Sequence, residues 1–238
     1  YPRNSFYLAT KLPVWLVNSV EDAERLFKEQ LSRLQTKYID YYLLHALDAG
    51  RWEKLVKEGI IEWAEAKKAS GKIRHLGFSF HDTYPVFREI LTYRQWDFCQ
   101  IQYNYIDTQV QAGDKGYELA AKMGVPMVIM EPVKGGRLAN LPEEAKEALN
   151  EADPDRSAAS WALRWVGSHE NVKVILSGMS SMEQLEDNLE TFGKFQPLTE
   201  AEEEAVEKAA DLIRSRVKNG CTSCRYCMPC PFGVNIPE

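Results

Sequence analysis

The sequence predicts an α/β fold of the (β/α)8-barrel, or TIM-barrel, type, and three observations support this prediction. Short β-branched or aromatic runs alternate with longer segments of helical period, which is typical of βα units and a parallel sheet. No Gly-x-Gly-x-x-Gly motif follows any of these runs, so the fingerprint of the doubly wound dinucleotide fold is absent. Polar side chains close nearly every expected strand, and barrel enzymes build their active sites from such strand ends.

The expected elements alternate regularly along the chain. Strands are expected over 6–11, 38–45, 73–79, 98–105, 126–131 and 172–177. Helices are expected over 19–35, 51–70, 82–93, 114–124, 156–167, 181–191 and about 200–218. Ser19, followed three residues later by Asp22, approximates a capping box, and the acidic run 200–204 after Thr199 suits the first turn of the last helix. Gly220 then ends that helix.

The polar residues at the strand ends are candidate functional residues. They are Lys11, His45, Ser79 with His81, Gln100 with Asn104, Glu131 with Lys134, and Ser177 with Gly178. The amine of Lys11 would point into the mouth of a barrel, and a strand-end lysine that only extends to solvent is the alternative. His45 ends one of the most apolar runs of the chain, where a hydrogen-bonded core histidine is the alternative.

Composition excludes several classes of partner. The chain has 238 residues, of which 45% are hydrophobic, and a formal net charge of −6 at pH 7. This apolar content is enough for a substantial core. Because the net charge is negative and no basic run is present, we expect no nucleic-acid partner. No apolar run approaches the ~18 residues of a membrane span, so we expect no membrane partner, and a cytoplasmic location is expected.

Four of the five cysteines lie close together near the end of the sequence: Cys221, Cys224, Cys227 and Cys230, with Pro231 directly after the last. Zinc sites usually combine two Cys-x-x-Cys pairs that are a dozen or more residues apart, whereas this run has no such gap. A tight run closed by Cys-Pro predicts the ligands of an iron–sulfur cluster. Zinc is the main alternative, and a disulfide knot is the second. Cys99 lies within an expected strand, where a core thiol is expected.

Six segments in chain order resemble one protein family. They are "FYLATK", "LSRLQTKYIDYYLLH", "IRHLGFSF", "FCQIQYNYID", "EPVKGGRL" and "VILSGMSSMEQLEDNLE". Together they span about residues 3 to 195 and are similar to the aldo/keto reductases, (β/α)8 enzymes that use a nicotinamide cofactor. The ending "CxxCxYCxPCP" resembles the branch with a C-terminal, ferredoxin-like 4Fe-4S extension. In two-cluster ferredoxins the cysteine before proline ligates the other cluster, so a different centre is an alternative for Cys230.

The resemblance implies hydride transfer between the nicotinamide and a carbonyl carbon, with a proton from a tyrosine that a lysine and its aspartate tune. By resemblance, Lys11 is the tuning lysine and His45 orients the substrate oxygen. The family's aspartate and tyrosine precede the strand of that lysine. We therefore expect that the first two βα units, about 60 residues at ~30 per unit, are missing from this chain, and that the chain alone is inactive. Tyr7, Tyr103 and Tyr105 are expected to be packing residues.

The resemblance also implies a site for NADP or NAD. Ser79 matches a serine that contacts the carboxamide, and His81 is expected to supply the polar contact of an asparagine that is Phe80 here. Gln100 matches an amide-binding glutamine, and Met130 replaces a stacking aromatic residue. The other matches are Lys134, Gly135, Gly136 and Arg137 for the pyrophosphate, where a plain turn is the alternative, and Gly178, Ser180, Gln184 and Asn188 for the adenosine end. The absence of lysine or arginine between 177 and 188 does not separate NAD from NADP.

These expectations divide the chain into three parts: a partial aldo/keto reductase barrel over 1–196, a C-terminal helix over 197–219, and an iron–sulfur segment over 220–238. The predicted function is an NAD(P)-dependent oxidoreductase that transfers hydride to a carbonyl substrate, with an appended cluster for electron transfer. The alternative is an electron-transfer or structural iron–sulfur module whose barrel lacks reductase activity. The expected partners are a small-molecule carbonyl, a redox partner protein and, because a partial barrel exposes its sheet edges, a second copy of the chain.

Overall fold

Six parallel strands form one sheet in the computed structural model, which describes residues 1–216 and 228–233. Each strand pairs with the next along the chain, in the order β1-β2-β3-β4-β5-β6. The strands are β1 (Ala9–Leu12), β2 (Ile39–Leu47), β3 (Ile73–Phe80), β4 (Phe98–Gln102), β5 (Met127–Met130) and β6 (Val172–Ile175). Parallel neighbours need crossover connections, and helices supply them here. The strand alternation that the sequence predicts is therefore confirmed.

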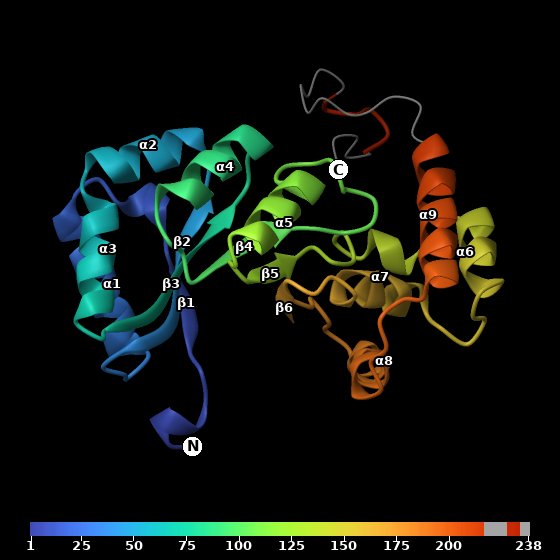
Figure 1. Ribbon diagram of the computed structural model, residues 1–238, viewed down its shortest axis with the longest axis horizontal. Coiled ribbons are helices and arrows are strands. Elements are labelled where there is room, and N and C mark those ends of the chain that lie inside the picture. The colour runs from blue at the N-terminus through green and yellow to red at the C-terminus, as the bar shows by residue number, and fades with distance from the viewer. Residues whose placement is uncertain (217–227, 234–238) are drawn as a thin grey trace.

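The helices flank the sheet and extend beyond it at the C-terminal end (Figure 1). They are α1 (Val20–Arg33), α2 (Ala49–Lys57), α3 (Ile60–Ala69), α4 (Tyr84–Tyr93), α5 (Gly113–Lys122), α6 (Glu143–Asn150), α7 (Ala158–Gly167), α8 (Met182–Gly193) and α9 (Glu200–Ser215). Helices α6 and α9 pack side by side at the end of the molecule opposite α1 and α3 (Figure 1). Within the described part of the chain, no helix has the length and apolar character that crossing a membrane requires.

Two element predictions need correction. The single helix expected over 51–70 is two helices, α2 and α3, because Gly59 between them adopts a left-handed conformation with φ 70°. Helix α6 was not expected, since its eight residues carry few large apolar side chains. The last helix begins as predicted, where Thr199 and Glu202 form a full capping box.

The two faces of the sheet have different roles. Lys11 pairs with Leu43, and Leu43 pairs with Gly77, so side chains at alternate positions from these residues share one face. Strand β3 pairs with β4, and β4 with β5, in the same way. The face of Lys11 therefore also carries His45, Ser79, Gln100 and Met130. The opposite face packs against the helices and forms the main hydrophobic core, with buried residues such as Tyr42, Leu44, Phe78, Cys99, Ile101 and Ile129.

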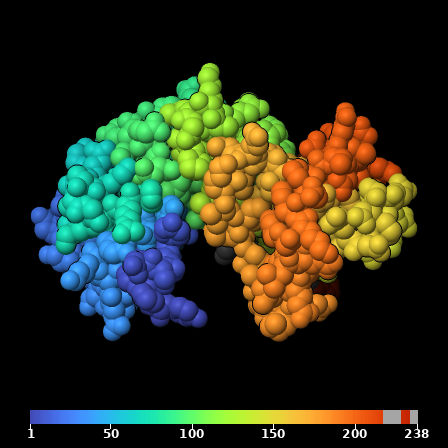
Figure 2. Space-filling model, turned by 60° about the horizontal axis from the view of Figure 1, so that its bottom comes forward, coloured from blue at the N-terminus to red at the C-terminus, as the bar shows by residue number. Residues whose placement is uncertain are grey.

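Strands β1 and β6 are the two edges of the sheet, each with one neighbour among the described residues. Val174 in β6 shares a face with Val128, yet its side chain is 49% exposed. Figure 2 shows an open gap between the N-terminal residues, in blue, and the region of α8, in orange. The sheet is therefore an incomplete ring in the part of the chain that the structure describes.

Candidate active site

Lys11 and His45 lie on the same face of the sheet, at the carboxyl ends of neighbouring strands. Burial lowers the pKa of the Lys11 ammonium. Burial also lowers the pKa of His45, and the positive charges of Lys11, His81 and Arg51 lower it further. The indole of Trp15 lies 5.1 Å from the imidazole of His45, centroid to centroid. A neutral imidazole beside an ammonium can donate a hydrogen bond to a substrate oxygen, so this pair is suited to binding a polarised carbonyl.

His81 belongs to the same electrostatic group. Burial lowers the pKa of His81, as do the charges of Lys11 and Arg51, whereas Glu131 acts in the opposite direction. Charges that shift the pKa of a histidine in this way lie close to it. The structure thus gathers Lys11, His45, His81 and Arg51 at the carboxyl ends of β1 to β3, with the carboxylate of Glu131 as the counter-charge.

Ser79 and Gln100 are neighbours on the same face and are both buried. The Ser79 hydroxyl accepts a hydrogen bond of 2.7 Å from the backbone N–H of Ala46. The amide of Gln100 donates to the sulfur of Met130 at 3.3 Å. The hydroxyl proton of Ser79 and the carbonyl of Gln100 remain as groups that a bound amide could meet.

The loop after β5 is tightly turned. Glu131, Lys134, Gly135 and Gly136 all have positive φ, and only glycine adopts such values without strain. The amine of Lys134 pairs with the carboxylate of Asp107, which is buried and also accepts from Gln102 and Asn104. Lys134 is predicted to face a phosphate, but in the structure its amine is already paired with a carboxylate. The side chain of Arg137 is exposed.

A cavity of about 620 Å³ adjoins this loop. Its walls come from the loop after β5 and from the segment between β6 and α8, together with α8 itself. Six of the residues that the sequence predicts for cofactor binding line it: Gly135, Gly136, Gly178, Ser180, Gln184 and Asn188. Gln184 accepts from the backbone N–H of Ser180 at 2.8 Å, and Asn188 donates to the hydroxyl of Ser177 at 2.9 Å. These contacts hold the segment around the first turns of α8 in one conformation.

Three residues of the region were not predicted to be functional from the sequence. Arg51 lies in the first turn of α2, close in sequence to the end of β2, but no motif indicated it. Asp107 lies in the loop after β4 and shows no motif. Asp187 lines the cavity with Gln184 and Asn188, and the i, i+3, i+4 spacing of these three on one helix could have identified it.

The three tyrosines behave differently. Tyr103 is buried and donates a 2.6 Å hydrogen bond to Asp114, and burial raises its pKa. Burial likewise raises the pKa of Tyr105. Tyr7 is 78% exposed and contacts the ring of Tyr41 edge to face. The packing role predicted for Tyr103 and Tyr105 agrees with these positions, and a raised pKa makes neither a better proton donor at pH 7.

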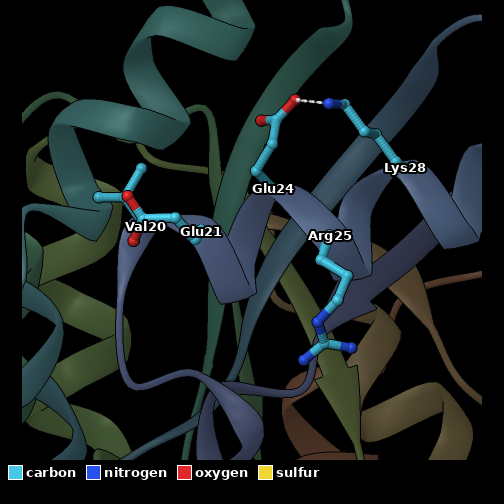
Figure 3. A pocket seen from close by; sticks show the side chains of 5 residues that line it. All are labelled: Val20, Glu21, Glu24, Arg25 and Lys28. Carbon is cyan, nitrogen blue, oxygen red and sulfur yellow. Dashed lines mark ion pairs between the residues drawn. The ribbon is translucent and has the colours of Figure 1, made fainter.

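A second hollow lies along α1, lined by Val20, Glu21, Glu24, Arg25 and Lys28 (Figure 3). Glu24 is engaged by three groups: Lys28 at 3.4 Å, Lys67 at 2.6 Å and the indole N–H of Trp63 at 2.9 Å. Hydrogen bonds from Lys67 and Trp63 lower the pKa of Glu24 to about 2. Its carboxylate therefore joins α1 to α3.

Three of the four predicted metal ligands, Cys221, Cys224 and Cys227, lie outside the described residues. Cys230 is a free, half-buried thiol. Within residues 1–216 and 228–233, no three side chains of the metal-binding types cluster. Cys99 is fully buried and burial raises the pKa of its thiol, as expected of a core cysteine.

A family model described as the aldo/keto reductase family matches residues 1–211. The chain belongs to the aldo/keto reductase family. This agrees with the parallel sheet and with the predicted TIM-barrel type of fold, and it makes the protein a member of an oxidoreductase family.

Solved structures of family members are similar in fold. The aldo-keto reductase AKR11C1 of Bacillus halodurans, in its holo form, is 29% identical, with a TM-score of 0.73 over 87% of this chain and 73% of that chain. An aldo/keto reductase of Klebsiella pneumoniae in complex with NADP and acetate is 23% identical, with a TM-score of 0.70 over 87% of this chain and 71% of that one. At that identity the second likeness concerns the fold alone.

Two curated relatives are both described as uncharacterized oxidoreductases. YqkF of Bacillus subtilis is 28% identical over 202 residues, which are 76% of this chain and 63% of that protein. A protein of Schizosaccharomyces pombe is 28% identical over 163 residues, 68% of this chain and 50% of that protein. The chain therefore spans between half and about two thirds of the length of these relatives.

Proposed function

We propose that the protein is an NAD(P)H-dependent carbonyl reductase. The observation that carries this proposal is the register of the sheet, since Lys11, His45, Ser79, Gln100 and Met130 share one face at the carboxyl ends of their strands. Reacting groups of barrel enzymes gather at that place. A cavity lies beside these strand ends, and its wall includes Gly178, Gln184 and Asn188. This cavity suits the cofactor.

Each residue has a distinct proposed task. Gln100 and Ser79 hydrogen-bond the carboxamide, and Met130 packs against the ring of the nicotinamide. Neutral His45 donates to the carbonyl oxygen of the substrate, and the Lys11 ammonium stabilises negative charge that develops on that oxygen. When bound, the reduced nicotinamide would supply a hydride to the carbonyl carbon, and a proton added to the oxygen would complete the alcohol. By the family resemblance a tyrosine gives that proton.

The cofactor is proposed to be NADH or NADPH. The described walls of the cavity carry the carboxylates of Glu131 and Asp187 and include no lysine or arginine. A 2′-phosphate is usually recognised by a cationic side chain. The proposed site therefore does not require the 2′-phosphate that NADPH carries and NADH lacks.

The experiment is turnover by the whole protein with a panel of aldehydes and ketones, followed as loss of the absorbance of the reduced nicotinamide. Lys11→Met and His45→Gln are expected to lower kcat at least about a hundredfold. Lys28→Met is the matched control, because Lys28 lies on α1 with a side chain that is 72% exposed. Absence of turnover with every carbonyl tested would sink the proposal, as would full activity in both variants.

We also propose that the cysteine run holds a 4Fe-4S cluster. Support comes from the sequence spacing of Cys221, Cys224, Cys227 and Cys230. A cluster would add one-electron transfer to a hydride-transfer enzyme and would call for a redox partner protein. Iron and acid-labile sulfide measured after anaerobic purification test this idea. Stoichiometric zinc without sulfide would refute it, and Cys227→Ser should lower the iron content.

A further inference from the structure

The strand that carries His45 contains an irregularity at that residue. Leu44 of β2 pairs with Phe78 of β3, and Leu47 pairs with Phe80. Two residues of β2, His45 and Ala46, therefore stand opposite the single residue Ser79. This is the geometry of a β-bulge, and bulges next to active sites redirect the side chain that they carry.

Ala46, the second residue of the bulge, has a left-handed backbone conformation with φ 55°. Alanine adopts this conformation only under strain, so neighbouring groups must hold it. Two side chains do so. The hydroxyl of Ser79 accepts from the N–H of Ala46 at 2.7 Å, and the guanidinium of Arg51 donates to the C=O of Ala46 at 2.6 Å.

In a regular strand, the N–H and the C=O of Ala46 would bond to a neighbouring strand. Here side chains bond to both groups. Ser79 is completely buried, which fixes its hydroxyl in place. Arg51 is anchored in turn by Asp48, at 3.3 Å, at the start of α2. The bulge is therefore clamped from β3 on one side and from α2 on the other.

We propose that Ser79 and Arg51 are positioning residues that aim the imidazole of His45 at the substrate by clamping the backbone of Ala46. This deepens the proposed function and rests on it for the role of His45. It adds a second task to the proposed contact of Ser79 with the carboxamide, because the hydroxyl oxygen accepts a hydrogen bond from Ala46 while the hydroxyl proton remains for the cofactor. Arg51 acts on the same peptide from outside the sheet.

The first test reads the imidazole directly and needs no activity. In proton–nitrogen correlation spectra of the whole protein, the signal of His45 is assigned through its loss in His45→Gln. Ser79→Ala and Arg51→Met are expected to shift or broaden this signal. The control Ser70→Ala removes an exposed hydroxyl that bonds only to the C=O of Lys67, and it should leave the signal unchanged. A His45 signal that stays at its original position in both clamp variants overturns the proposal.

The second test separates the clamp from a cofactor contact. Ser79→Ala should lower kcat about tenfold to a hundredfold. Adding Ala46→Gly should restore much of the loss, because glycine adopts the left-handed conformation without support. A loss of kcat that Ala46→Gly does not restore would mean that Ser79 acts only through the cofactor, and it would refute the clamp. If His45→Gln and Lys11→Met are both fully active, the proposed function fails while the spectra still decide on the clamp.

Discussion

At the scale of single residues, the buried arginine of α7 is the clearest case of a charge held by its partners. Arg164 is 3% exposed, and its guanidinium forms a two-pronged ion pair with Glu202 at 2.6 and 3.1 Å. Glu202 also accepts from the N–H of Thr199 at 2.8 Å, so it joins α7 to the first turn of α9. The hydrogen bonds from Arg164, which outweigh the effect of burial, lower the pKa of Glu202 to about 2.

This pair predicts a pH-dependent stability. The pKa of Glu202 is lower in the folded state than its ordinary value of 4.5, so its stabilising effect is complete above pH 4.5 and is lost as the pH falls towards 2. Glu202→Gln is expected to lower the free energy of unfolding by about 2–3 kcal/mol at pH 7. Urea denaturation at several pH values measures this difference, which should shrink below pH 4.5.

The control for that prediction is Glu207→Gln, an exposed glutamate on the same helix. Surface substitutions of this kind change the free energy of unfolding by about 0.5 kcal/mol or less. A Glu202→Gln effect of that small size, or one that is independent of pH, would contradict the account of the ion pair.

At the scale of elements, the close approach of β3 and β4 depends on a glycine, Gly77, which has no side chain. A Cβ at Gly77 would lie 2.6 Å from the carbonyl oxygen of Phe98 and 2.7 Å from its ring. These are distances that atoms do not tolerate, so either the strands must separate or the ring must move. Gly77 thus lets the two strands pair at the centre of the face that carries the candidate site.

Gly77→Ala is therefore expected to lower the free energy of unfolding by about 1–3 kcal/mol, through overpacking. Chemical denaturation measures it. Gly50→Ala is the matched control, since the nearest atom to its added Cβ is 3.8 Å away and alanine favours the helix. Equal stability of Gly77→Ala and the original protein would show that the strands are less closely paired than described.

The sequence predicted the order of the elements and the strand-end residues because both depend on local patterns. Alternating apolar runs identify strands, and the register then brings Lys11 and His45 to one face. The bulge at 45–46 could not be predicted, since it depends on how β2 aligns with Ser79. The pairing of Lys134 with Asp107 was missed for the same reason: it joins two loops that no local pattern connects.

At the scale of the whole molecule, apolar side chains are exposed on α8 and on the edge strand β6 of the described part of the chain. Leu189 and Phe192 lie three residues apart on α8 and are 62% and 42% exposed, close in sequence to Met182 at 67%. Val174, on the edge strand β6, is 49% exposed. Unpaired strand edges beside apolar side chains favour association.

The chain expressed by itself is therefore expected to self-associate. Sedimentation velocity should give species larger than a monomer, and the double variant Leu189→Lys, Phe192→Lys should move the distribution towards the monomer. Lys208→Ala, on the exposed surface of α9, should have no such effect. A single monomeric species of the unmodified chain would contradict this prediction.

Fluorescence titration of the whole protein with NADH and NADPH tests whether the cavity beside the loop after β5 holds a reduced nicotinamide cofactor. Gly178→Phe should fill the cavity without disturbing the fold, because no atom lies within 4 Å of a Cβ added there. Gly193→Phe is the control, with equally open space outside the cavity. We predict saturable binding that Gly178→Phe weakens at least about tenfold and Gly193→Phe leaves unchanged. No saturable binding of either cofactor, or equal affinity in the two variants, would contradict the account.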